Sequence, residues 1–323
     1  MPTLPHDVPA PCASAADNRL RALLAAGRLD LPLPGHGDTA SRWAELADLG
    51  RDDLAVARLA EGHTDAVAIP AEAGRTAEAG ALYGVWAARP GGTGASLRSS
   101  VLEGTVRFCS GAHLVDRALV VADSGDGRVL VDVAVDPPWA RPDPDSWNTP
   151  AMAAADTLDV WFGRVPVAPS DVVGGTDWYV RRPGFAIGGG GVAAVWWGGA
   201  AGLLDRALDH LGASPDAHQL AHVGELGAQL AAMDALLDRV AAEIDADPLG
   251  DHALRVARVR CAVERTVRDV LDRVPRTLGP VPLSGDADLA RTLADLGIYI
   301  RQHHGERDHA ALGAAMIDAR KVS

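Results

Sequence analysis

The stretch Gly104-Thr-Val-Arg-Phe-Cys-Ser-Gly-Ala112, followed by Asp116-Arg-Ala-Leu-Val-Val-Ala122, is the most informative part of the chain. Its β-branched and apolar runs predict two strands, and the Ser-Gly pair predicts a short polar turn between them. Such a turn would expose backbone amides and the hydroxyl of Ser110, with Phe108 as a flat apolar wall beside them. This combination suits the polar edge of a flat ring.

The sequence around this stretch changes its pattern twice. Residues 16–80 carry apolar side chains at helical spacing, and residues 81–182 switch to short β-branched runs. Residues 183–320 return to helical spacing. The segments expected as helices are 18–26, 40–62, 191–211, 216–245, 252–274 and 286–307, with Asp216 as an N-cap. The segments expected as strands are 118–122, 129–135 and 158–162, with a hairpin turn at 123–127.

This order predicts an α+β fold that is mostly α. We expect a shortened helical N-terminal domain at 1–80 and a middle β domain at 81–182. Four long helices with short loops predict a four-helix bundle at 183–323.

Three further segments complete a resemblance to the acyl-CoA dehydrogenase superfamily. They are Leu49–His63, Gly84–Gly94 and Asp159–Val167, and their order matches the family's. The resemblance implies a β-barrel-like middle domain and bound FAD. It implies flavin contacts from residues 86–111 and from the helix expected after Asp216. The cofactor-binding residues expected in this way are Trp86, Ala88, Phe108, Ser110, Gly111, His222, Gly224 and His304. The substrate-binding residues expected are His63, Arg89 and Tyr299.

The segment from Asp295 to Asp308 resembles the one that delivers the family's catalytic glutamate. Aligned on Asp295 and Tyr299, His303 falls near the glutamate position, and Glu306 would fall there if the register slipped by one helical turn. A histidine is a plausible base because its pKa lies near neutrality. The alternative is an exposed polar pair, His303 and His304, that ends a helix.

The neighbouring histidines do not predict a metal site. His303, His304 and His309 with Asp308 lack a recognised ligand spacing, so we expect no metal.

The resemblance implies an FAD-dependent oxidoreductase acting on an acyl thioester, by α-proton abstraction and hydride transfer to flavin N5. Two alternatives stay open. A flavin-dependent monooxygenase or oxidase of the same fold is favoured by His303 at the glutamate position. A degenerate, flavin-free binding or assembly subunit is favoured by the shortened N-terminal domain. It is also favoured by Ala88 and Arg89, which replace the family's Thr-Glu pair.

Composition restricts the partners. A net charge of −13 argues against nucleic acid, and three scattered cysteines fit a reducing compartment. We find no signal-peptide pattern and expect a cytoplasmic protein. The uncharged stretch 184–204 is long enough to span a membrane, but its four consecutive glycines favour a buried helix. We therefore expect no membrane partner. The resemblance implies a homodimer or homotetramer, with an electron acceptor protein or oxygen as redox partner.

Overall fold

A computed structural model describes residues 11–322, which form two compact units. The β unit combines the chain up to Asp30 with Gly62–Tyr179. The helical unit combines Leu31–Glu61 with the chain from Val180 onward. The boundary between the two units that follows the sheet thus lies after Tyr179, close to the predicted domain boundary at 182. The division into three domains stays a prediction.

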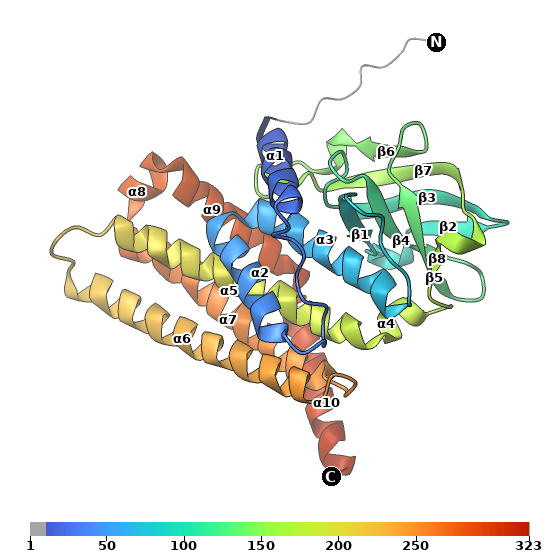
Figure 1. Cartoon of the computed structure of the whole chain (residues 1–323). Helices are drawn as coiled ribbons and strands as arrows, with labels where there is room; N and C mark the ends of the chain where they lie inside the picture. The colour runs from blue at the N-terminus through green and yellow to red at the C-terminus, as the bar shows by residue number, and fades with distance from the viewer. Residues whose placement is uncertain (1–10, 323) are drawn as a thin grey trace. The chain divides into compact units, whose positions relative to one another are not determined.

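One mixed sheet runs through the β unit (Figure 1). Its strand order is β6-β7-β3-β2-β4-β5-β8, and β1 pairs with β4. The pairs β1–β4 and β2–β4 are parallel, and the others are antiparallel. The strands are β1 Tyr83–Trp86, β2 Ala95–Arg98, β3 Val101–Cys109, β4 Arg117–Asp123, β5 Arg128–Ala134, β6 Ala140–Asp143, β7 Leu158–Pro166 and β8 Val172–Val173.

The predicted strands at 118–122, 129–135 and 158–162 are confirmed as β4, β5 and β7. The hairpin at 123–127 is also confirmed, because the amide of Ser124 donates to the Gly127 carbonyl at 2.9 Å. The two strands predicted on either side of the turn at 110–111 are confirmed as β3 and β4. These strands do not pair with each other, because both pair with β2, which lies between them.

The remaining elements of the β unit are α1 (Pro11–Ala25), the second half of α3 (Leu54–Glu72) and short 3-10 turns. The turns are Pro90–Gly92, Pro144–Ser146, Ala153–Ala155 and Pro169–Asp171. Part of the core lies where Ala66 and Ile69 of α3 meet Tyr83, Leu119 and Leu130 of the sheet. A short helix, α4 (Trp178–Arg181), follows the last strand.

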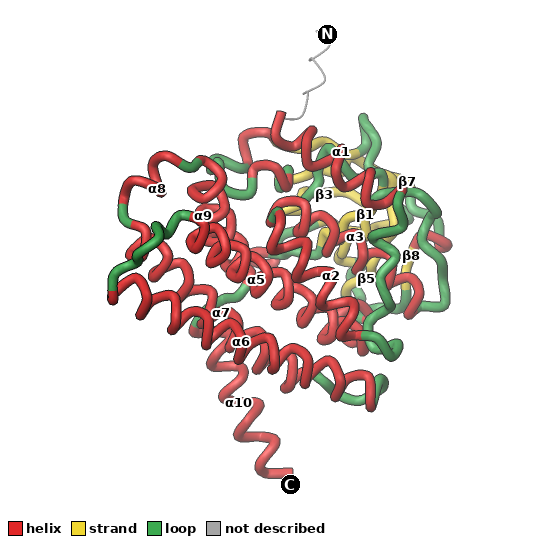
Figure 2. Tube along the Cα trace, turned by 60° about the vertical axis from the view of Figure 1, so that its left-hand side comes forward, coloured by secondary structure: helices red, strands yellow, loops and turns green. Residues whose placement is uncertain are grey.

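Three long helices lie side by side in the helical unit (Figure 2). Helix α5 (Pro183–Asp209) packs against α2 (Thr39–Asp52) and α7 (Ala253–Leu278), and α7 also packs against α6 (Ala217–Ala246). The other elements are α8 (Pro280–Gly285), α9 (Ala287–Tyr299), the 3-10 turn Ile300–Gln302 and α10 (Glu306–Val322).

Helix α5 begins at Pro183, well before the expected start at residue 191, and runs through the four-glycine stretch. The glycines let neighbouring helices approach closely. A Cβ on Gly190 would overlap the Trp43 ring, and one on Gly198 would overlap the Ala47 carbonyl. Packing therefore outweighs the low helix propensity of glycine. Among the described residues, α5 alone is long and apolar enough to cross a membrane. Burial of 89% of its apolar window agrees with a core helix.

The start of α6 follows the prediction closely. The Asp216 carboxylate accepts the amides of His218 and Gln219, and the Gln219 side chain accepts the Asp216 amide at 3.0 Å. This reciprocal pair satisfies amides that the first helical turn leaves unpaired.

Two predicted helices are interrupted. The segment 40–62 breaks at Asp53, whose side chain caps α3 by accepting the amides of Ala55 and Val56. The segment 286–307 leaves helical geometry after Gln302, and His303 has φ −83° and ψ 128°. Gly305 then takes a positive φ of 54° before α10 begins. His303 and His304 therefore lie in a tight loop between helices.

Candidate functional sites

The turn after β3 presents one aromatic ring and a pair of hydroxyls. Phe108 has a positive φ of 59° and stays 43% exposed, with the Arg107 guanidinium 4.8 Å from its ring centroid. The Ser110 hydroxyl lies 2.9 Å from the Thr157 hydroxyl. Only one hydrogen can occupy that contact, so the pair retains a second one to donate elsewhere. Thr157 is a residue that sequence reasoning missed.

The backbone of the same turn is not available in the predicted way. The Gly111 amide donates to Ala155 at 2.9 Å, and the Ala112 amide donates to Asp156 at 3.0 Å. The Phe108 amide faces the Asp159 carboxylate at 3.3 Å. The expectation of exposed amides at these three positions is therefore wrong, and the hydroxyls and the ring are the groups left to meet a ligand.

Trp86 is a core residue of the β unit. Its side chain is 1% exposed, its ring packs at a tilt against Phe162, and its Nε1 donates to the Ser110 carbonyl at 3.0 Å. These contacts hold the Ser110 backbone in place, and the predicted flavin contact of Trp86 stays a prediction.

Ala88 and Arg89 follow β1. The Arg89 guanidinium donates to the carbonyl of Gly92 at 3.1 Å and lies 3.5 Å from that of Ala95. These two contacts hold the loop for which the resemblance implies contact with the substrate. The side chain of Ala88, next to Arg89, is half-buried. Their predicted ligand contacts stay predictions.

His63 is buried in the β unit with 3% of its surface exposed. Its Nδ1 accepts the Tyr83 amide at 3.1 Å and so joins α3 to the start of β1. Burial lowers the pKa of His63 to about 4, although Asp30 and Asp116 act in the opposite direction. A neutral histidine that anchors a strand fits a core role better than the predicted contact with substrate.

His222 and Gly224 lie on α6. The Nδ1 of His222 is 3.2 Å from the Arg273 guanidinium of α7. Gly224 is exposed, and a Cβ placed on it would meet no other atom within 4 Å. This exposed part of α6 leaves room for a ligand or a second chain. The predicted flavin contacts there remain untested.

A cluster of buried polar side chains surrounds His303 in the helical unit. His303 is 4% exposed, and its Nε2 lies 3.4 Å from the thiol of Cys261 on α7. Its ring meets that of His309 edge-on at a centroid distance of 5.2 Å. The alternative reading of an exposed His303–His304 pair is therefore wrong for His303 and holds only for His304, whose side chain is 53% exposed.

Both ring nitrogens of His303 have neighbours inside the unit. The Nδ1 accepts the Gly305 amide at 3.1 Å, so in the neutral ring the proton sits on Nε2, beside Cys261. Burial lowers the pKa of His303, and nearby Arg260 and His309 act in the same direction, against Glu264 and Asp308. The ring is therefore neutral at physiological pH, and burial likewise raises the pKa of the Cys261 thiol.

Sequence reasoning missed a second part of this cluster. The Glu61 carboxylate accepts from Arg58 at 2.8 Å and from the Tyr299 hydroxyl at 3.2 Å. The Arg260 guanidinium lies 4.7 Å from the Trp196 ring centroid and donates to the Gly189 carbonyl at 2.8 Å. Tyr299, which was predicted to bind substrate, is thus a buried residue whose hydroxyl donates to Glu61.

Two predicted residues of the loop point elsewhere. Glu306 is exposed in the first turn of α10, and no contact places its carboxylate in the cluster. His304 contacts Asp308, with its Nδ1 3.4 Å from Oδ1. Of the two candidates for the glutamate position, His303 is buried and Glu306 is exposed, and their catalytic roles stay predictions.

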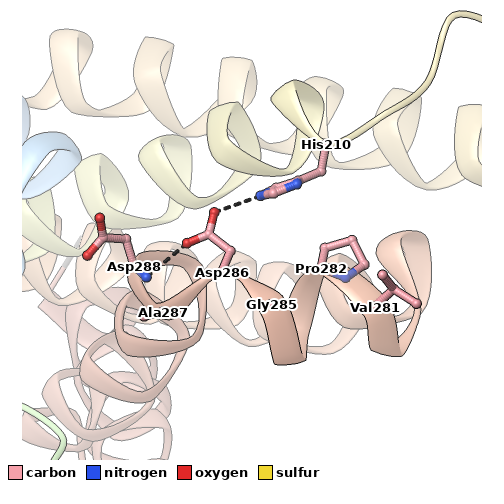
Figure 3. Close-up of a pocket in the computed structure, with 7 residues that line it drawn as sticks. All are labelled: His210, Val281, Pro282, Gly285, Asp286, Ala287 and Asp288. Carbon is pink, nitrogen blue, oxygen red and sulfur yellow. Dashed lines mark hydrogen bonds and ion pairs between the residues drawn. The ribbon is translucent and has the colours of Figure 1, made fainter.

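A separate groove of about 540 Å³ lies along α8 and the start of α9 (Figure 3). The Nε2 of His210 reaches across to Asp286 at 2.8 Å, while Asp286 also caps α9. None of the predicted site residues lines this groove. We attribute it to the way the short helix α8 packs against α7 and α9.

Known structures share this fold. The chain resembles the dibenzothiophene monooxygenase TdsC from Paenibacillus sp. A11-2 with a TM-score of 0.79 and 17% identity, over 95% of this chain and 96% of that one. Methanesulfinate monooxygenase MsuC from Pseudomonas fluorescens gives 0.76 and 19%, over 97% and 98%. A nitrososynthase from Micromonospora carbonacea var. africana gives 0.71 and 18%, over 90% and 92%.

Two of the similar structures contain FMN. TdsC has been solved with FMN, and KijD3, at a TM-score of 0.76 and 18% identity, has been solved with FMN and a dTDP-linked sugar. No family model matches the sequence, and no curated protein matches it significantly. At such low identity the likeness establishes the fold alone. The chain thus has the mostly helical α+β fold of acyl-CoA dehydrogenase-like proteins, with a mixed sheet.

Proposed function

We propose that this protein is a flavin-dependent monooxygenase that acts on a small molecule, with FMN in place of the FAD expected from sequence. The observation that carries the proposal is the burial of the His303 imidazole, a residue that the resemblance aligns with the glutamate a dehydrogenase needs. Thioester dehydrogenation uses a carboxylate to take the α-proton. Oxygen transfer has no such requirement. The monooxygenases of the same fold support this reading.

The turn after β3 fits one part of a flavin. The exposed Phe108 ring offers a stacking surface, and the Ser110–Thr157 pair offers a hydroxyl hydrogen to an acceptor on the ring edge. Bound reduced flavin would supply the electrons that activate oxygen. In this proposal the β unit orients the ring through these side chains.

His303 is our candidate proton donor or acceptor in the helical unit. Because Nδ1 accepts the Gly305 amide, the neutral ring can donate the proton on Nε2 and can take a second proton only if the bond from Gly305 breaks. The adjacent His309 ring is not buried, so it links the pair to solvent. Ala88, Arg89, His222, Gly224 and His304 are secondary candidates for ligand contacts.

A flavin titration tests the proposal. Reduced and oxidised FMN and FAD are added to the purified chain, and binding is followed by flavin fluorescence and absorbance. We expect FMN to bind, most tightly when reduced. Phe108→Ala and the double variant Ser110→Ala/Thr157→Val should each weaken binding about tenfold, which corresponds to about 1.4 kcal/mol.

Two control variants keep the result specific. Trp139→Ala removes a ring of the same 43% exposure from the β unit, and Ser214→Ala removes an exposed hydroxyl from the helical unit. Neither should change the affinity for FMN. If no flavin binds in either redox state, the enzyme proposal fails and the flavin-free alternative takes its place.

A further inference from the structure

Three side chains that can ligate a metal meet in the helical unit although they are far apart in sequence. Cys261 comes from α7, His303 from the loop before α10, and His309 from the first turns of α10. Each offers one sulfur or nitrogen atom, and these atoms lie within 4.8 Å of one another. The closest pair is Cys261 Sγ and His303 Nε2 at 3.4 Å.

The surroundings of this triad are mostly buried and hold both signs of charge: Asp308 and Glu264 are nearby, and so is Arg260, while Glu264 Oε1 is paired with Arg268 at 2.9 Å. Cys261 and His303 are buried, while His309 opens toward solvent and gives an ion a way in. Asp308 Oδ2 lies 4.0 Å from His303 Nε2. Glu264 is one helical turn from Cys261 on the same face of α7, and its Oε2 is buried with no hydrogen-bond partner among residues 11–322. A cation would offset the cost of burying that oxygen.

We propose that Cys261, His303 and His309 bind a divalent transition metal of the zinc class. One thiolate and two imidazoles favour Zn²⁺ or Co²⁺ over Mg²⁺ and Ca²⁺, which prefer oxygen ligands. Asp308, Glu264 or a water molecule would complete the tetrahedron. Bound there, the ion fastens α10 to α7. This inference does not rest on flavin binding, but a His303 ring that ligates the ion through Nε2 has no proton there to donate, so the metal-bound protein would not use His303 as its proton donor.

The hydrogen bonds define what binding must change. His309 Nδ1 lies 3.2 Å from the Gly305 carbonyl, and donation to that oxygen leaves Nε2 with a free lone pair to face the ion. His303 is the opposite case, because its Nδ1 accepts the Gly305 amide and its proton is on Nε2. Ligation through Nε2 moves that proton to Nδ1 and breaks the bond from Gly305, while the Cys261 thiol releases its proton to solvent. The loop at Gly305 must therefore rearrange when the ion binds.

Cobalt titration of the full-length, metal-free chain tests the proposal directly. We expect one Co²⁺ per chain, with the near-ultraviolet charge-transfer absorption of a cobalt thiolate and a raised thermal unfolding temperature. Cys261→Ser should abolish this absorption. The matched control is Cys109→Ser, a buried thiol of the β unit that donates to the Val106 carbonyl, and it should leave the absorption unchanged.

Competition with a chromophoric chelator then measures Zn²⁺ affinity. His309→Ala should weaken it by about two orders of magnitude, because one of the ligands is lost. His309 is not buried, so this variant tests the site even if substitution of Cys261 or His303 disturbs folding. The control is His210→Ala, whose ring contacts Asp286. A chain that takes up no Co²⁺, or a cobalt–thiolate absorption that survives Cys261→Ser, would overturn the proposal. Since flavin is absent throughout, neither result bears on FMN binding.

Discussion

Two buried histidines, one in each unit, make the same local hydrogen bond in different surroundings. The Nδ1 of His63 accepts the Tyr83 amide, and the Nδ1 of His303 accepts the Gly305 amide, both at 3.1 Å. Burial lowers the pKa of both rings. By these local measures the two residues are equivalent.

Their neighbours separate them. His63 joins α3 to β1 beside an apolar core. His303 faces a thiol and a second imidazole, with Asp308 and Glu264 nearby. A buried histidine therefore indicates a site only when long-range packing brings other reactive groups to it. We therefore propose an anchoring role for His63 and a chemical role for His303.

The largest expected effect is on stability. His63→Ala leaves a cavity and an unpaired Tyr83 amide, so we expect the free energy of unfolding to fall by about 4 kcal/mol. His63→Asn keeps an acceptor and should recover part of this. Urea denaturation of both variants measures the loss. An effect of His63→Ala below about 1 kcal/mol would break the contrast with His303.

The next effect is a pH dependence. The folded-state pKa of His63 is about 4, below its ordinary value of 6.5, so between these values the unfolded chain binds a proton that the folded chain does not. The low pKa of His63 therefore adds its full contribution to the free energy of unfolding above pH 6.5. This contribution, about 3 kcal/mol in all, is lost as the pH falls toward 4. We expect His63→Asn to lack this component when the two unfolding curves are subtracted. Parallel curves would show that His63 is not neutral in the folded protein.

A smaller effect concerns the loop that holds His303. Gly305 has a φ of 54°, so Gly305→Ala should destabilise the protein by about 1 kcal/mol even though no atom crowds its Cβ position. Gly313→Ala is the matched control inside α10, where alanine should stabilise by up to about 1 kcal/mol. Thermal unfolding of both variants tests the sign. If Gly305→Ala stabilised the protein, residue 305 would not have the positive φ described above.

The smallest effect tests the electrostatic side of the contrast. Glu264 raises the pKa of His303, so Glu264→Gln should lower this pKa further. Histidine proton resonances followed over pH report this shift. Glu225→Gln on the exposed part of α6 serves as the control and should leave the His303 resonance unchanged.

The sequence predicted what depends on neighbouring residues. The Asp216 cap, the hairpin at 123–127 and the strands around it were predicted because their signals are local. The range 191–211 began α5 too late, although the stretch 184–204 was predicted as a buried helix. Its glycines pack against Trp43, far away in the chain, and local helix propensity does not report such a contact.

The same limit applies to the candidate sites. The sequence singled out His303 through its resemblance to a catalytic segment. It gave no indication of Cys261, which precedes His303 by 42 positions and meets it only through the packing of α7. For the same reason the expectation of no metal, which considered only His304, His309 and Asp308 as partners, could not foresee this triad.

The most direct test of the proposed function compares two reactions of the flavin-loaded protein. One sample receives an acyl-CoA without oxygen, and the other is reduced and then mixed with oxygenated buffer, with flavin absorbance followed in both. We predict that acyl-CoA leaves the oxidised flavin unbleached. We also predict that the protein changes the rate at which reduced flavin reacts with oxygen, relative to free FMN. Bleaching by acyl-CoA, with oxygen reactivity like that of free FMN, would contradict the monooxygenase proposal and restore thioester dehydrogenation.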